Sequence, residues 1–144
     1  MYQTEKAISN NSKLDDSAFM SQFEDCSLSP DNFDHIGHLR IAWLYISQYG
    51  STKAIDLVCD GINTYAKSLG ANDKFHFTIT ASLVKIIASS IKEQSTKSWQ
   101  VFLQQNDDLV SDALGVLYRY FSKSKLHSEL ARTSLLEPDL QEIS

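Results

Sequence analysis

Three long stretches of the sequence carry apolar residues at the spacing of an α-helix, and this periodicity constrains the fold more than any other feature. They cover about residues 34–49, 51–69 and 75–91, and glycines at 50 and 70 follow the first two as helix stops. An apolar stripe with this spacing has to be buried against another helix. The chain carries no comparable strand pattern, so the sequence predicts an all-α fold.

Weaker helical patterns flank these three stretches. One begins at Asp15 or Asp16 and ends near Cys26, and others are expected at about 99–105, 108–121 and 128–135. Short connections make consecutive helices antiparallel neighbours, so we expect a single-domain antiparallel helical bundle of about six or seven helices over residues 15–144. A mobile tail is expected at 1–14. The apolar stripes predict a core that contains Leu39, Trp43, Ile46, Ile55, Val58, Ile62, Leu83, Ile86 and Ile87.

Charge and composition narrow the classes of partner. The 18 acidic residues outnumber the 13 basic ones, the net charge is −5, and no cluster of cations is present that would bind the phosphates of a nucleic acid. No apolar run is long enough to cross a membrane, and the N-terminus is too polar for a signal peptide. Cys26 and Cys59 are too few for a disulfide framework and are expected to be reduced. We therefore expect a cytoplasmic protein without nucleic-acid or membrane partners, and its oligomeric state stays open.

The histidines are the strongest functional signal. His35 and His38 are three residues apart near the start of one predicted helix, which places their Cβ atoms roughly 5–6 Å apart. His76 lies on the extrapolated apolar stripe at the start of a later helix. In an antiparallel bundle these helix starts meet the C-terminal end of the first helix, which carries Glu24. The topology thus predicts a site at one end of the bundle.

Three functions fit this predicted site. In a metal-dependent enzyme or metal-binding protein, the three histidines bind zinc, iron, copper or nickel, and Glu24 is a fourth ligand or a catalytic base. Thr80 or a loop carbonyl then accepts a hydrogen bond from the N–H of one imidazole. In a non-metal module, Arg40 and the imidazoles bind an anionic small molecule. In an interaction protein, exposed helix faces bind a partner. A histidine on an apolar face is also often a core residue that donates one hydrogen bond.

Two motifs give the chain a likeness to other proteins. Residues 33–43 read F-x-H-x-x-H-L-R-x-A-W and residues 74–80 read K-F-H-x-T-x-T, with Phe23 and Glu24 before them and P-D-L at 138–140. This pattern resembles a family of small uncharacterised all-helical bacterial proteins, over nearly the whole chain after the tail. The resemblance implies a role for the histidines. The family pattern has glutamate where Phe77 stands, so a ligand or base at that position would be missing here.

Overall fold

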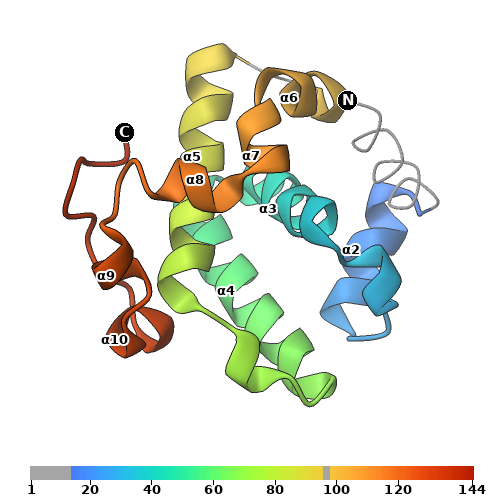
Figure 1. Cartoon of the computed structure of the whole chain (residues 1–144). Coiled ribbons are helices and arrows are strands. Elements are labelled where there is room, and N and C mark those ends of the chain that lie inside the picture. The colour runs from blue at the N-terminus through green and yellow to red at the C-terminus, as the bar shows by residue number, and fades with distance from the viewer. Residues whose placement is uncertain (1–13, 96–97) are drawn as a thin grey trace.

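The structure, a computed structural model, describes residues 14–95 and 98–144, and the regular secondary structure of this part of the chain is entirely helical (Figure 1). This confirms the expected all-α helical bundle. Of the expected tail at 1–14, residues 1–13 lie outside the described residues. No described helix has the length and apolar character needed to cross a membrane. The helices are α2 (Asp16–Glu24), α3 (His35–Tyr49), α4 (Ser51–Ser68), α5 (Phe77–Gln94), α6 (Trp99–Gln105), α7 (Asp107–Ser111), α8 (Ala113–Leu117), α9 (Lys123–Leu126) and α10 (Glu129–Thr133), with 3-10 turns η1 (Pro30–Asn32) and η2 (Asn72–Lys74).

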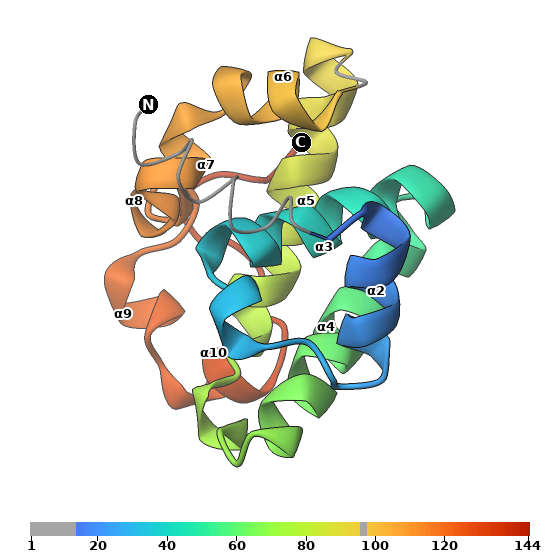
Figure 2. The same cartoon turned by 90° about the vertical axis from the view of Figure 1, so that its right-hand side faces the viewer.

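Helix α3 lies at the centre of the molecule and is covered on several sides (Figure 2). It packs against α4 and α5, while Trp43 contacts the rings of Trp99 and Phe102 in α6 at centroid distances of 6.0 and 5.2 Å. The apolar stripe predicted one buried face, but Ile41 and Leu44 outside that stripe are buried as well. A helix that is apolar nearly all round belongs in a core, where other elements cover each of its faces.

Arg40 is buried in this core and joins α3 to the start of α2. Its guanidinium donates hydrogen bonds to the Asp16 carboxylate at 2.9 Å and to the carbonyl of Leu14 at 2.8 Å. It also lies over the Phe19 ring, 4.4 Å from the centroid. The Leu14 side chain packs against the core, although the sequence placed this residue in the tail. Arg40 therefore stabilises the packing of α2 against α3. It was expected to bind an anionic small molecule, and its contacts in the structure are those of a core residue instead.

The C-terminal third contains more and shorter helices than the sequence predicts. The described residues form nine α-helices instead of six or seven. Asp112 has an extended φ of −153°, so the expected helix at 108–121 is interrupted there, and its carboxylate caps the next helix at Gly115 N. Ser122 and Ser128 cap α9 and α10 in the same way. Side-chain caps of this kind favour new helix starts over the continuation of one helix.

Most of the expected core is buried in the structure. Three of the expected core residues have partly exposed side chains. For Leu83 the reason is that it lines a pocket described below. Buried as expected are Leu39, Trp43, Val58, Ile62, Ile86 and Ile87, while Ile46, Ile55 and Leu83 are partly buried.

An aromatic cluster fixes the distance between α2 and α4. Phe23 contacts the rings of Phe33 and Tyr65 at centroid distances of 5.1 and 5.9 Å, and it is 1% exposed. Gly61 of α4 faces this ring, and a Cβ added there would lie 2.6 Å from a Phe23 ring carbon. The absence of a side chain at residue 61 lets the two helices approach.

We predict that Gly61→Ala destabilises the protein, with a loss of about 1 kcal/mol in the free energy of unfolding. Overpacking a core costs about 1–3 kcal/mol, and the better helix propensity of alanine returns up to about 1 kcal/mol of this. Urea unfolding measures the difference. In a Phe23→Leu background the same Gly61→Ala change should cost less, because the ring it strikes is gone. Equal costs in both backgrounds would show that the Phe23 contact is not the cause.

Candidate functional site

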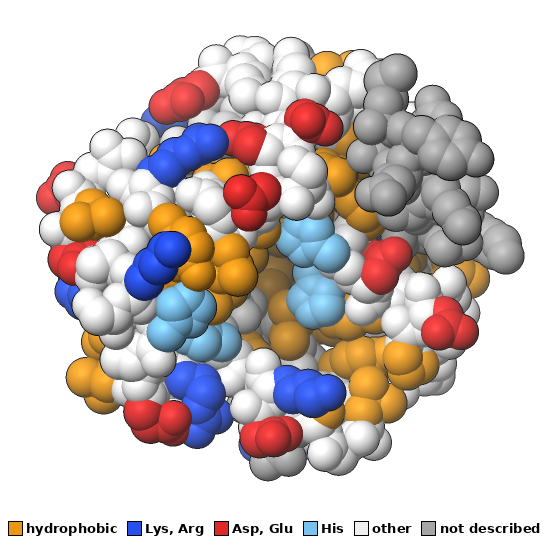
Figure 3. Space-filling view, in the orientation of Figure 1, with side chains coloured by type: hydrophobic (Ala, Val, Ile, Leu, Met, Phe, Trp, Pro, Cys, Tyr) orange, Lys and Arg blue, Asp and Glu red, His pale blue; other side chains and the backbone are white. Residues whose placement is uncertain are grey.

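A pocket of about 500 Å³ lies between α3, α4 and α5 (Figure 3). Figure 3 shows it as a hollow with an apolar floor and histidine side chains on its rim. Its polar lining consists of Asp34, His35 and His38 at the start of α3 and of Lys74, His76 and Thr80 around the start of α5. The apolar lining consists of Phe33, Leu39, Ala42, Val58, Ile62, Phe75, Ile79, Leu83, Val84 and Ile87.

His38 is held in one orientation at this pocket. Asp34 caps α3 through a hydrogen bond from Gly37 N–H to its carboxylate at 2.9 Å, and the carbonyl of Asp34 accepts a hydrogen bond from His38 Nδ1–H at 2.8 Å. The Phe33 ring stacks on the imidazole with centroids 4.1 Å apart. Because a carbonyl can only accept, Nδ1 carries the proton, and Nε2 of the neutral ring is a hydrogen-bond acceptor.

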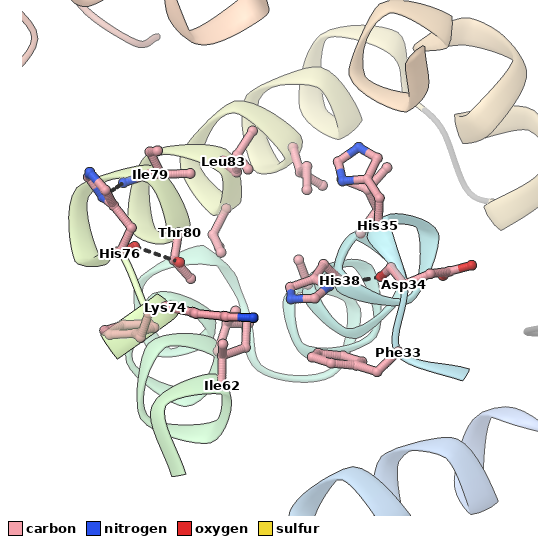
Figure 4. A pocket seen from close by; sticks show the side chains of 16 residues that line it. Phe33, Asp34, His35, His38, Ile62, Lys74, His76, Ile79, Thr80 and Leu83 are labelled. Carbon is pink, nitrogen blue, oxygen red and sulfur yellow. Dashed lines mark hydrogen bonds between the residues drawn. The ribbon is translucent and has the colours of Figure 1, made fainter. Parts of the chain in front are cut away.

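Nε2 of His38 makes no hydrogen bond to the described residues. Figure 4 shows the ring directed into the pocket. Burial lowers the pKa of His38, and the repulsion from His35 adds to this, against the opposing effect of the Asp34 carbonyl. The ring is therefore neutral at physiological pH. His38 is partly exposed at the pocket, so water or a ligand can reach this nitrogen and supply the donor whose absence costs a buried acceptor about 1–3 kcal/mol.

Lys74 supplies the pocket's positive charge. It ends η2, lines the pocket opposite His38, and its side chain extends across the mouth toward the imidazole (Figure 4). Within the described part of the chain, Lys74 forms no salt bridge. Lys74 belongs to the K-F-H-x-T-x-T motif but was not among the predicted site residues. Its position two residues before His76 was the available signal.

The other two predicted histidine ligands have structural partners far along the chain. His35 is exposed, and its Nε2–H donates to the Leu109 carbonyl of α7 at 2.8 Å. His76 Nδ1 accepts the N–H of Ile79 at 3.1 Å and thereby caps α5, while its Nε2–H donates to the Leu126 carbonyl at 2.9 Å. Both nitrogens of His76 are thus engaged, and Figure 4 shows its ring at the outer edge of the pocket.

These directions correct the expected metal site. His35, His38 and His76 all line the pocket, but no group of three or more His, Cys, Asp or Glu residues within 14–95 and 98–144 is placed to hold a metal ion. A shared zinc, iron, copper or nickel site would need all three imidazoles to turn lone pairs toward one point. His76 cannot do so, because its Nδ1 accepts the Ile79 N–H and its Nε2–H donates to the Leu126 carbonyl.

Glu24 and Thr80 have other partners than those expected for them. The Glu24 carboxylate accepts the Tyr45 hydroxyl at 2.7 Å, and Glu24 does not line the pocket. Thr80 does line it, but its hydroxyl donates to the His76 carbonyl at 2.7 Å, and the His76 Nε2–H goes to the Leu126 carbonyl rather than to Thr80. Phe77 packs edge-on against Phe75, with ring centroids 6.0 Å apart.

Arg40, expected to bind an anion, lies outside the pocket lining, and Lys74 provides the cation instead.

The capping role of His76 predicts a pH dependence of stability. Burial lowers its pKa, and nearby His127 and Arg132 lower it further. The unfolded chain therefore binds a proton at a pH where the folded chain does not, so stability is complete above the unfolded pKa of about 6.5 and declines as pH falls toward the folded pKa. His76→Asn keeps a capping oxygen but does not titrate, so its unfolding free energy should fall less between pH 7.5 and 5. Superimposable pH profiles from urea unfolding would contradict this role.

Comparisons with known proteins give no indication of function. No protein-family model matches the chain, and neither curated proteins nor solved structures show a significant similarity to it. The resemblance of the two histidine motifs to a bacterial family therefore stays a prediction. What the chain does has to be inferred from the residues that line this pocket.

Proposed function

We propose that this chain is a small-molecule-binding helical module whose ligand occupies the pocket between α3, α4 and α5. The observation that carries the proposal is the combination of an apolar cavity of about 500 Å³ with a lysine at its mouth and an imidazole nitrogen that has no partner in the described part of the chain. Ligand pockets in proteins commonly enclose about 300–1,000 Å³, with mostly apolar walls and a few polar groups that orient the ligand.

The lining supports a ligand with two unlike ends. Ile62, Leu83 and Ile87 belong to the apolar walls, and they would take up an alkyl or ring system. His38 and Lys74 provide an acceptor and a cation at the polar side. Among the described residues that line the pocket, Lys74 is the one Lys or Arg, and its ammonium favours an anionic group on the ligand.

Binding of octanoate provides a direct test. We expect isothermal titration calorimetry to detect its binding to the full chain, and we expect Leu83→Trp to weaken the affinity by about tenfold or more, because the indole fills the volume that the alkyl chain needs. Leu83 is only partly buried, so the larger side chain can be accommodated toward the pocket.

A matched control separates pocket filling from a general effect of tryptophan. Leu69 is 48% exposed and lies outside the pocket lining, so Leu69→Trp makes the same change away from the site. It should leave the octanoate affinity unchanged. Circular dichroism establishes that both variants keep their helix content. Octanoate binding that is absent, or that Leu83→Trp leaves as it was, would contradict the proposed function.

A further inference from the structure

His38 and Lys74, on opposite sides of the pocket, need different hydrogen-bonding groups on a ligand. His38 Nε2 is a neutral acceptor, because Nδ1–H is committed to the Asp34 carbonyl at 2.8 Å. It therefore needs a donor, which a carboxylate cannot supply. The ammonium of Lys74 only donates, and it needs an acceptor or an anion. A plain carboxylic acid satisfies Lys74 alone, and a plain alcohol lacks the charge that complements it.

The orientation of His38 is fixed by more than one contact. Phe33 stacks on one face of the ring with centroids 4.1 Å apart, and the Asp34 carbonyl that accepts Nδ1–H also accepts the backbone N–H of His38 at 3.0 Å. Asp34 is itself fixed as the cap of α3. An acceptor held this firmly discriminates between ligands, since a site that cannot rearrange leaves its polar atom unpaired when the donor is missing.

We propose that the ligand is an amphipathic hydroxy acid, and this proposal rests on the proposed function. Its carboxylate pairs with Lys74, its hydroxyl donates a hydrogen bond to His38 Nε2, and its alkyl chain packs against Leu39, Ile62 and Leu83. The hydroxyl sits close to the carboxylate, because the imidazole and the lysine side chain point toward one another across the mouth (Figure 4). The hydroxyl distinguishes this class from simple fatty acids.

Three probes with the same chain length separate the contributions. Calorimetry at pH 7.5 compares 3-hydroxyoctanoate, octanoate and octanol on the full chain. We expect the hydroxy acid to bind about fivefold more tightly than octanoate, which is the contribution of one net hydrogen bond between neutral groups. Lys74→Met should lower the affinity for both acids by about threefold, as loss of an exposed charge pair does. It should leave the affinity for octanol and the ratio of the two acid affinities unchanged.

His38→Phe is the variant that tests the acceptor. Phenylalanine can keep the stacking on Phe33 but has no lone pair, so the affinities for 3-hydroxyoctanoate and octanoate should become equal. A second measurement avoids any dependence on how this variant folds. In the wild-type chain, the ¹⁵N signal of His38 Nε2 should shift on addition of 3-hydroxyoctanoate more than on addition of octanoate.

The outcomes distinguish this proposal from the proposed function. Equal affinity of the wild-type chain for the two acids, or a hydroxyl preference that survives in His38→Phe, would overturn the hydroxy-acid assignment and leave a binding pocket for simple amphiphiles. A His38 ¹⁵N signal that responds equally to both acids would do the same. Failure of all three probes to bind would remove the proposed function together with the assignment.

Discussion

The burial of α3 is the constraint on which the rest of the structure depends. Nine of its 15 residues are buried, and they include Arg40 as well as apolar side chains. A helix of this kind is stable only if neighbouring elements cover its faces, and here α4, α5 and α6 each pack against it. The pocket lies where the first turns of α3 face α4 and α5, so the helix that organises the core also carries the polar groups of the site.

The number of engaged nitrogens separates structural histidines from the site histidine. His76 uses both ring nitrogens, one for the cap of α5 and one for the Leu126 carbonyl, and its burial is fully compensated. His38 uses one nitrogen and turns the other toward the pocket. The same residue type, lining the same pocket, therefore has two physical roles. A tautomer fixed by a backbone carbonyl is a common way to orient a functional imidazole.

The periodicity of the sequence predicted the long helices well, because their apolar stripes and glycine stops are local signals. It also predicted that His35, His38 and His76 lie in one region, because the order of antiparallel helices brings the starts of their helices to the same end of the bundle. The directions of their rings could not be predicted, because the partners of His35 and His76 are the carbonyls of Leu109 and Leu126, 74 and 50 residues away. The short C-terminal helices escaped prediction for another reason. Single capping residues such as Asp112 interrupt a pattern that is otherwise continuous.

The two cysteines differ in a way that makes the chain easy to label. Cys59 is buried in α4, and burial together with nearby Asp60 and Asp56 raises the pKa of its thiol to about 12. At neutral pH almost none of it is the reactive thiolate. Cys26, just after α2, is partly exposed. A maleimide dye added to the unmodified protein would therefore attach at Cys26 alone, which places one fluorophore beside the aromatic cluster without any substitution.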